Sequence, residues 1–377
     1  MFERMLVGIL LCSTAIMPRI ALIGLGHWGV NYIPLLARRG ALEALVDIDP
    51  AVLSAAPASN NIARFKTLDH LLAKGPLIDG IIVASTASTH FDIAVRALSY
   101  GLAVLVEKPV ARTLRQAAKL YRTAAGNDAT LMSGHLLIHH EGVHYLWEQT
   151  RTGQLGEPRY LRSTRIDIGR VRWEEDVLWS FAVHDFSLVL TLMGQMPESL
   201  LAQKYRLRGA PQADLATVDL KFPAGARAAI HVSWVGPERE HRLLLYTRNG
   251  TARFNGGQEG KRAVMVHMMQ SNEKNHGSAM DSTELNVIAP PIVRPLDRQV
   301  ELFCRYLVTG KTPPQDRAIA LGVMSLLEAA DSSCVADREV RIGPSDDIDP
   351  KLFTPSNSWP DPEDPYQDSW KHSDGRS

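Results

Sequence analysis

Short apolar runs alternate with longer helix-like segments through the first third of the chain. The runs span residues 20–23, 44–46, 80–84, 103–106 and 130–133. Strands that alternate with helical segments are typical of βαβ units, whose crossovers are right-handed. The pattern therefore predicts an α/β fold with a doubly wound parallel sheet over residues 18–140.

The pattern changes in the second half of the chain. Strand-like alternation with turn glycines follows in residues 158–168, 217–222, 228–235, 241–246 and 251–254. Such alternation predicts a large, mostly antiparallel sheet. One helix is expected at 179–192, and two more at 297–336, split by the turn at 310–314. Together these segments predict a second, α+β domain over residues 141–345.

The two ends of the chain fit neither pattern. Residues 1–17 carry one arginine and the apolar run Met5–Cys12, which is too short to span a bilayer. We favour an N-terminal extension or a start at Met17, although export through residues 1–16 is an alternative. Residues 346–377 are rich in Pro, Asp and Ser, which predicts a disordered acidic tail.

Composition narrows the class of protein. The 377 residues are 45% hydrophobic and 22% charged, with 41 basic and 41 acidic side chains. This is a globular composition, and the charge balance favours neither nucleic acid nor an anionic membrane as a partner. Cys12, Cys304 and Cys334 have neither metal-ligand nor disulfide spacing. We therefore expect a reducing, cytoplasmic location.

The sequence I-A-L-I-G-L-G-H-W-G places Gly24, Gly26 and Gly29 in a turn between an apolar strand and a helix. In a dinucleotide site the first glycine permits the turn, the second lets backbone approach a pyrophosphate, and the third allows close packing. Asp47 follows about 20 residues on, where a carboxylate accepts from the adenosine ribose. Since no arginine lies in residues 47–58 to receive a 2′-phosphate, NAD is expected rather than NADP.

Glu107-Lys108-Pro109 ends the predicted strand at 103–106. Ligands of open α/β sheets bind beyond the carboxyl ends of the strands, so Lys108 would reach the site. Pro109 raises the chance of a cis peptide bond. The alternative interpretation is a surface turn.

His184 lies in the apolar segment W-S-F-A-V-H-D-F-S-L-V-L. Removal of hydride from a secondary alcohol needs a base for the hydroxyl proton, and histidine titrates near neutrality. The alternative is a core histidine with a satisfied hydrogen bond. Asp185 is not an automatic partner for it, because adjacent helix residues point about 100° apart.

The segment H-E-G-V-H, His140 to His144, matches the spacing of a zinc protease, with His135 and His139 nearby. Gly142 weakens the helix that such a site needs. We therefore expect no metal site, and interpret these histidines as a hinge or cleft edge that offers a candidate for a substrate contact.

Five arginines gather around a predicted strand: Arg159, Arg162, Arg165, Arg170 and Arg172. They form either a solvated face or a site for an anion, since arginine binds carboxylate and phosphate bidentately.

Over residues 18–342 the chain resembles the glucose–fructose oxidoreductase / inositol dehydrogenase (Gfo/Idh/MocA) family. The resemblance rests on the glycine turn, V-D-I-D-P, I-I-V-A-S-T-A-S-T-H, V-L-V-E-K-P-V, M-S-G-H-L-L-I-H-H, G-Q-L-G-E-P and L-F-C-R-Y-L-V-T-G-K-T-P-P. It implies an N-terminal Rossmann sheet that binds NAD and a C-terminal α+β domain for substrate and oligomerisation. The exposed sheet of that domain commonly pairs with a copy of itself, which implies a homodimer or homotetramer.

The resemblance also implies roles for particular residues. The catalytic pair would be Lys108 and His184. The cofactor contacts would be Gly24, Gly26, His27, Trp28, Gly29, Asp47, Ser85, Thr86, His90, Glu107 and Lys108. The substrate contacts would be Arg165, Arg170, Arg172, Ser180 and His184.

Within the family, G-R-V-R-W-E-E-D-V-L-W-S-F-A-V-H-D-F-S resembles the nucleotide-sugar 3-dehydrogenases that oxidise UDP-N-acetylglucosaminuronate. Two positions depart from that pattern, because Ser180 replaces an aspartate and Val183 replaces a proline. The expected activity is hydride transfer between NAD and a secondary alcohol of a sugar, inositol or nucleotide sugar. The alternative is a non-catalytic NAD-binding sensor or assembly protein, which Ser180 favours and the retained Lys108 and His184 oppose.

Overall fold

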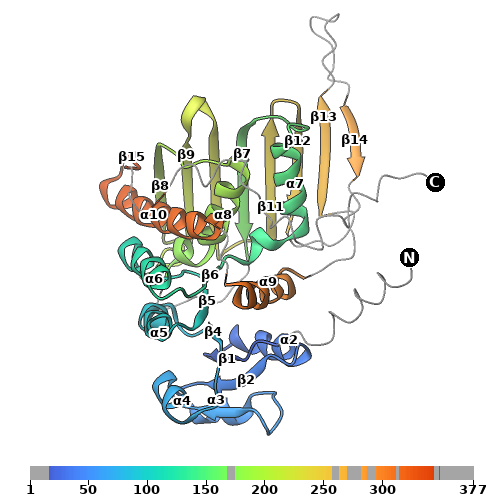
Figure 1. Ribbon diagram of the computed structural model, residues 1–377. Coiled ribbons are helices and arrows are strands. Elements are labelled where there is room, and N and C mark those ends of the chain that lie inside the picture. The colour runs from blue at the N-terminus through green and yellow to red at the C-terminus, as the bar shows by residue number, and fades with distance from the viewer. Residues whose placement is uncertain are drawn as a thin grey trace, which may run out of the picture. The chain divides into compact units, whose positions relative to one another are not determined.

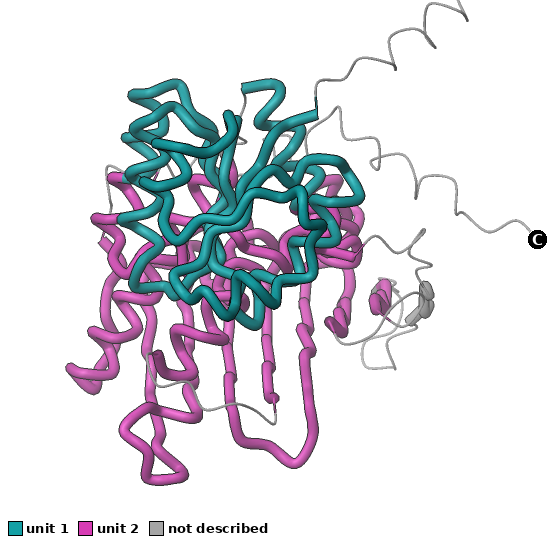
Figure 2. Tube along the Cα trace, turned by 90° about the horizontal axis from the view of Figure 1, so that it is seen from below, with its two compact units in different colours: residues 1–107, 120–132, 300–312 teal, residues 108–119, 133–299, 313–377 magenta. Residues whose placement is uncertain are grey.

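The computed structural model describes residues 17–167, 175–256, 263–269, 282–286, 294–310, 314–343 and 348. The chain forms two compact units, coloured separately in Figure 2. Unit 1 comprises residues 1–107, 120–132 and 300–312, and unit 2 comprises residues 108–119, 133–299 and 313–377.

These units do not coincide with the expected boundary at residue 140, because late segments return to unit 1. The end of α9 (Pro295–Thr309) packs on the first sheet, where a β-carbon at Gly80 would meet Leu307 Cδ1 at 2.7 Å. Residues 108–119 instead group with unit 2, in which Leu114 N donates to Glu328 Oε1 at 2.7 Å. Contacts distant in sequence therefore set the boundary.

A six-stranded sheet forms the centre of unit 1, in the order β3-β2-β1-β4-β5-β6 (Figure 1). Its strands are β1 (Ile20–Ile23), β2 (Leu42–Val46), β3 (Ala63–Phe65), β4 (Gly80–Val83), β5 (Ala103–Glu107) and β6 (Leu131–Gly134). The sheet is parallel, as predicted, and β1, β4 and β5 are near-continuous apolar runs because they are buried on both faces. Strand β3 was missed because its three residues are only half-buried.

Two helices of unit 1 begin at side-chain caps. Asp49 accepts from Ala51 N at the start of α3, and Thr67 accepts from His70 N at the start of α4. The elements are η1 (Gly29–Tyr32), α2 (Ile33–Arg38), α3 (Pro50–Ala55), α4 (Leu68–Lys74), α5 (Ala87–Ser99) and α6 (Leu114–Gly126), of which residues 114–119 belong to unit 2.

Unit 2 contains a nine-stranded sheet in the order β14-β13-β12-β11-β7-β10-β9-β8-β15. The predicted strands appear as β7 (Pro158–Ile166), β9 (Leu215–Lys221), β10 (Arg227–Ser233), β11 (Glu240–Thr247) and β12 (Gly250–Asn255). The sequence missed β8 (Ser199–Tyr205), β13 (Val264–Met269), β14 (Ser282–Asn286) and β15 (Val340–Arg341). The pairing is mostly antiparallel, as expected, with a parallel pair between β7 and β10.

Three helices cover one face of this sheet: α7 (Glu141–Arg151), α8 (Val183–Met193) and α10 (Pro314–Ala336) (Figure 1). Shorter turns are η2 (Leu136–His139), η3 (Leu178–Ala182) and η4 (Pro223–Gly225). In the described part of the chain, α10 alone is long and apolar enough to cross a membrane. Since 61% of that stretch is buried inside the molecule, it fits a core helix.

Candidate active site

The glycine turn after β1 has the geometry that the sequence predicted. Gly24 has φ +87°, and a β-carbon there would lie 2.4 Å from Ser85 N. A β-carbon at Gly29 would lie 1.9 Å from Gly24 O, whereas one at Gly26 would meet nothing within 4 Å. The turn is therefore closed at its first and third glycines and open at the second, which fits the approach of a pyrophosphate to the backbone.

Asp47 directly follows β2 and is tied to the same turn. Its Oδ2 accepts from Leu25 N at 2.7 Å, and its Oδ1 accepts from Asp49 N at 3.0 Å. A carboxylate offers about four acceptor positions, so capacity is left for the ribose hydroxyls of a dinucleotide. The residues of unit 1 thus fit NAD at both its pyrophosphate and its adenosine end.

Glu107 has a structural task that the sequence did not reveal. Only 6% of the residue is exposed, and its Oε1 accepts from Trp28 Nε1 at 2.5 Å and from Tyr32 OH at 2.6 Å. Trp28 itself is 40% exposed, next to the exposed His27 in the glycine turn. Glu107 therefore holds the glycine turn from its buried side, through the indole of Trp28.

The loop after β4 carries the other expected cofactor residues. Thr86 precedes α5, and Ser85 Oγ lies 2.7 Å from Thr89 Oγ1. His90 is buried, with Nε2 3.1 Å from Ser85 O. His90 therefore fixes this loop from below, and Ser85 with Thr86 forms its outer part.

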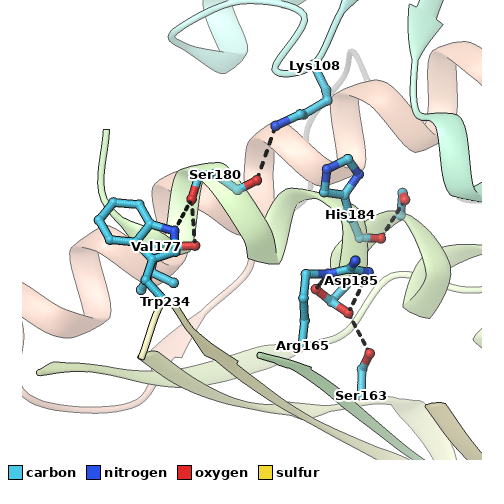
Figure 3. A network of polar contacts seen from close by, with 9 residues as sticks. Lys108, Ser163, Arg165, Val177, Ser180, His184, Asp185 and Trp234 are labelled. Carbon is cyan, nitrogen blue, oxygen red and sulfur yellow. Dashed lines mark hydrogen bonds and ion pairs between the residues drawn. The ribbon is translucent and has the colours of Figure 1, made fainter. Parts of the chain in front are cut away.

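Lys108 and His184 come together within unit 2, as Figure 3 shows. The Lys108–Pro109 peptide bond is cis, which confirms the prediction. Lys108 Nζ donates to Ser180 O at 3.2 Å, and Ser180 lies in the single π-helical turn η3. Such turns occur frequently at functional sites. The Ser180 hydroxyl is buried and accepts from Trp234 Nε1 at 3.1 Å.

His184 is the exception on its helix. Every other residue of α8 is buried, whereas His184 is partly exposed and lies on the Lys108 side of the helix in Figure 3. This position favours a functional histidine over a core one, because a core histidine would share the burial of its neighbours.

Asp185 points the other way, toward β7. Its Oδ2 accepts from Arg165 Nε at 2.8 Å, and its Oδ1 accepts from Arg165 Nη2 at 3.3 Å and Ser163 Oγ at 2.5 Å. The side chains of the ion pair are 8% and 1% exposed. The structure thus gives Arg165 a buried internal carboxylate in place of the expected substrate anion.

The remaining arginines divide into two groups. Arg159 and Arg162 are exposed, and Arg159 pairs with Glu157 at 2.9 Å, which fits a solvated face. Arg170 and Arg172 lie outside the described residues.

The histidine-rich segment after β6 is largely buried. Burial lowers the pKa of His135 to about 4 and the pKa values of His139 and His144 to about 3, so all three are neutral near pH 7. The charge of Lys108 further lowers the pKa of His135, which follows β6 directly as Lys108 follows β5. Of these histidines, His135 is thus the candidate for a substrate contact, a role that the sequence analysis gave to the group without choosing a member.

Helix α7 begins at Glu141 and includes Gly142, so the helix that the zinc spacing required does form. His140 Nδ1 accepts from Gly142 N at 3.0 Å and caps the helix. A β-carbon at Gly142 would lie 2.7 Å from Val264 Cγ2, which explains the glycine by packing. Among the described residues, no group of three His, Cys, Asp or Glu side chains could hold a metal ion.

A small hollow lies beside the Arg165–Asp185 pair, entirely within unit 2. His241, at the start of β11, contributes to its polar lining. Burial lowers the pKa of His241 to about 4, and the charge of Arg165 lowers it further. The sequence gave no signal for His241, because it reaches this place only through strand pairing.

Comparison with known proteins identifies the family of the chain. Residues 18–135 match the model of an oxidoreductase family with an NAD-binding Rossmann fold, and residues 143–253 match the C-terminal domain model of the same GFO/IDH/MocA family. The chain therefore belongs to the Gfo/Idh/MocA family of NAD-binding oxidoreductases.

Among curated relatives, UDP-N-acetylglucosamine 3-dehydrogenase of Acidithiobacillus ferrooxidans is 28% identical over 229 residues, 60% of this chain and 71% of that protein. Myo-inositol 2-dehydrogenase of Thermotoga maritima is 24% identical over 224 residues, 56% of this chain and 67% of that protein. An Agrobacterium radiobacter oxidoreductase solved with NAD+ and L-tartaric acid has a TM-score of 0.73 at 21% identity, covering 87% of this chain and 99% of that one. That structure shows the shared fold.

Proposed function

We propose that this protein is an NAD-dependent dehydrogenase that transfers hydride between NAD and a secondary hydroxyl of a sugar, inositol or nucleotide sugar. The observation that carries the proposal is the meeting of Lys108 and His184 in unit 2. One is a charged donor held by the Ser180 carbonyl, and the other is the only residue of α8 that is not buried.

The cofactor would be held in unit 1 by the open turn at Gly26 and by the Asp47 carboxylate, and when bound it supplies the hydride acceptor. Lys108 donates a hydrogen bond to the reacting hydroxyl and stabilises the negative charge that develops on its oxygen. His184 accepts the hydroxyl proton as general base. The protein thereby supplies orientation, a proton acceptor and a fixed positive charge.

The contacts of Ser180 bear on the charge of the substrate. Its hydroxyl is engaged by Trp234 and its carbonyl by Lys108, so it does not replace the aspartate of the nucleotide-sugar branch as a charged group. UDP-N-acetylhexosaminuronate, oxidised at C3, therefore stays one candidate beside neutral sugars and inositols. Its carboxylate would need a cation other than Arg165, whose charge Asp185 already neutralises.

The test is a panel of inositols, free sugars and UDP-sugars with NAD, followed by the absorbance of the reduced nicotinamide. We expect at least one panel member to be oxidised. We expect His184→Ala to lower kcat by about 10²–10⁴-fold, the usual contribution of a general base, and Lys108→Ala to lower it also. NAD binding, measured by calorimetry, should persist in both variants. Unchanged turnover in both variants would remove the catalytic assignment.

The second candidate is an NAD-binding sensor or assembly protein without catalysis, which the buried and already engaged Ser180 hydroxyl favours. It predicts that the wild-type protein binds NAD yet oxidises no panel member. Calorimetry with NAD and the panel sugars, run beside the absorbance assay, separates the two functions.

A further inference from the structure

Helix α8 continues directly from the π-helical turn η3, whose spiral is wider than that of the helix that follows. The side-chain cap lies before η3, where Asp176 Oδ1 accepts from Trp179 N at 3.2 Å. His184 is the second residue of α8, so the rotation of the chain where the two spirals join sets the direction of His184.

The contacts of Asp185 fix that rotation from the sheet. Ser163 and Arg165 stand two residues apart on β7, so their side chains leave the same face of the sheet. Together they donate three hydrogen bonds to the Asp185 carboxylate, two of them from the planar guanidinium of Arg165. A bidentate arginine restricts the orientation of its carboxylate as well as its position.

His184 and Asp185 are adjacent, so they project from α8 about 100° apart. In Figure 3 Asp185 lies toward Arg165 and Ser163 on the sheet, while the His184 ring lies toward Lys108. Holding one side chain on the sheet therefore directs the other toward the lysine.

We propose that Ser163, Arg165 and Asp185 form a clamp that positions His184 for proton transfer, an inference that rests on the proposed role of His184 as the base. Its members are positioning residues, and Arg165 serves the site through α8 and does not bind a substrate anion.

A buried ion pair by itself is weak evidence for a stabilising role, because well-packed apolar residues often hold a fold equally well. The position of this pair, beside the proposed base where η3 joins α8, points to geometry as its purpose. A purely structural role and a positioning role therefore predict different effects of mutation on kcat.

The decisive variant is Asp185→Asn, which keeps the shape of the side chain and removes its charge. We expect kcat on the best panel substrate to fall by as much as about 100-fold, the cost of misplacing a group near the chemistry by about 1 Å. KM should change little, because ground-state binding is not involved.

Asp214→Asn is the matched control: Asp214 is also buried, accepts from Leu207 N and Arg208 N, and pairs with Arg208. It should lower the melting temperature with kcat retained.

If Asp185→Asn fails to fold, Ser163→Ala and Ser163→Thr carry the test. Loss of one of three donors should lower kcat in Ser163→Ala, and the threonine hydroxyl should restore it. Unchanged kcat in Ser163→Ala, or a loss in Asp185→Asn no larger than in Asp214→Asn, overturns the clamp.

A readout without substrate separates this inference from the proposed function. The imidazole signals of His184 in a two-bond ¹H–¹⁵N spectrum, assigned with His184→Gln, should move in Asp185→Asn and stay in Asp214→Asn. If no panel member is oxidised, the proposed function fails while the spectrum still decides the clamp. Identical His184 signals in wild type and Asp185→Asn contradict it.

Discussion

At the scale of single residues, the glycines of the first turn differ in what surrounds them. A side chain at Gly29 would collide with the backbone of Gly24, so its loss disturbs the folded turn itself. Gly26 faces open space, so the absence of a side chain there leaves room for a ligand to approach the backbone.

The two glycines therefore form a matched pair for mutation. Gly26→Ala should leave the melting temperature near that of wild type but weaken NAD binding, since the new methyl group occupies the space of the ligand. Gly29→Ala should lower the melting temperature as well, because its β-carbon would lie 1.9 Å from Gly24 O. Thermal scans and NAD calorimetry on both variants check this. Undiminished NAD affinity in Gly26→Ala would contradict the site.

At the scale of elements, the turn η2 carries a titratable group into the interior of unit 2. His139 is 5% exposed, and its folded-state pKa of about 3 lies well below the ordinary 6.5, chiefly through burial and secondarily through the charge of Arg298. The folded protein therefore keeps His139 neutral where the unfolded chain binds a proton. Stability is lost as pH falls from about 6.5 toward 3.

Replacement of His139 by leucine should remove this sensitivity. One such group lowers the free energy of unfolding by about 2 kcal/mol between pH 6.5 and 5, at 1.36 kcal/mol per pH unit. Urea unfolding of wild type and His139→Leu at both pH values measures the difference. The wild type should lose more stability on acidification than the variant, with His144 accounting for part of what remains. Equal losses would show that His139 is not held neutral.

At the scale of the whole molecule, self-association through the unit 2 sheet stays a prediction from family resemblance. Along β7, Leu161 is buried on the helix-covered face and Tyr160 is exposed on the opposite one. Tyr246 of β11 pairs with Tyr160, and their ring centroids are 5.8 Å apart. Exposed aromatic side chains are enriched at protein interfaces.

We therefore expect a solution mass of two or four times the 41.6 kDa chain, measured by light scattering after gel filtration. The double variant Tyr160→Glu/Tyr246→Glu should shift the protein toward the single-chain mass, because burying two carboxylates in an interface is costly. Arg159→Glu, an exposed change on the same strand, is the control for altered charge. A single-chain mass for the wild type would contradict the prediction.

The sequence by itself determined the features that depend on local pattern. Apolar periodicity marked five of the six strands of the first sheet, the spacing of Gly24, Gly26 and Gly29 indicated the nucleotide turn, and Lys108 fell at the end of a recognisable strand. These features are readable because strand burial and turn chemistry act over a few neighbouring residues.

Only the tertiary structure decided the partners of the buried charges. The sequence offered Arg165 as an anion-binding residue and assigned Asp185 no partner. In the folded chain Arg165 Nε donates to Asp185 Oδ2, 20 residues away. Glu107 likewise found Trp28, 79 residues away. Which side chains meet in the interior depends on how strands pair and on which face of a helix turns inward, and a charge there is stable only with the partner that this packing supplies.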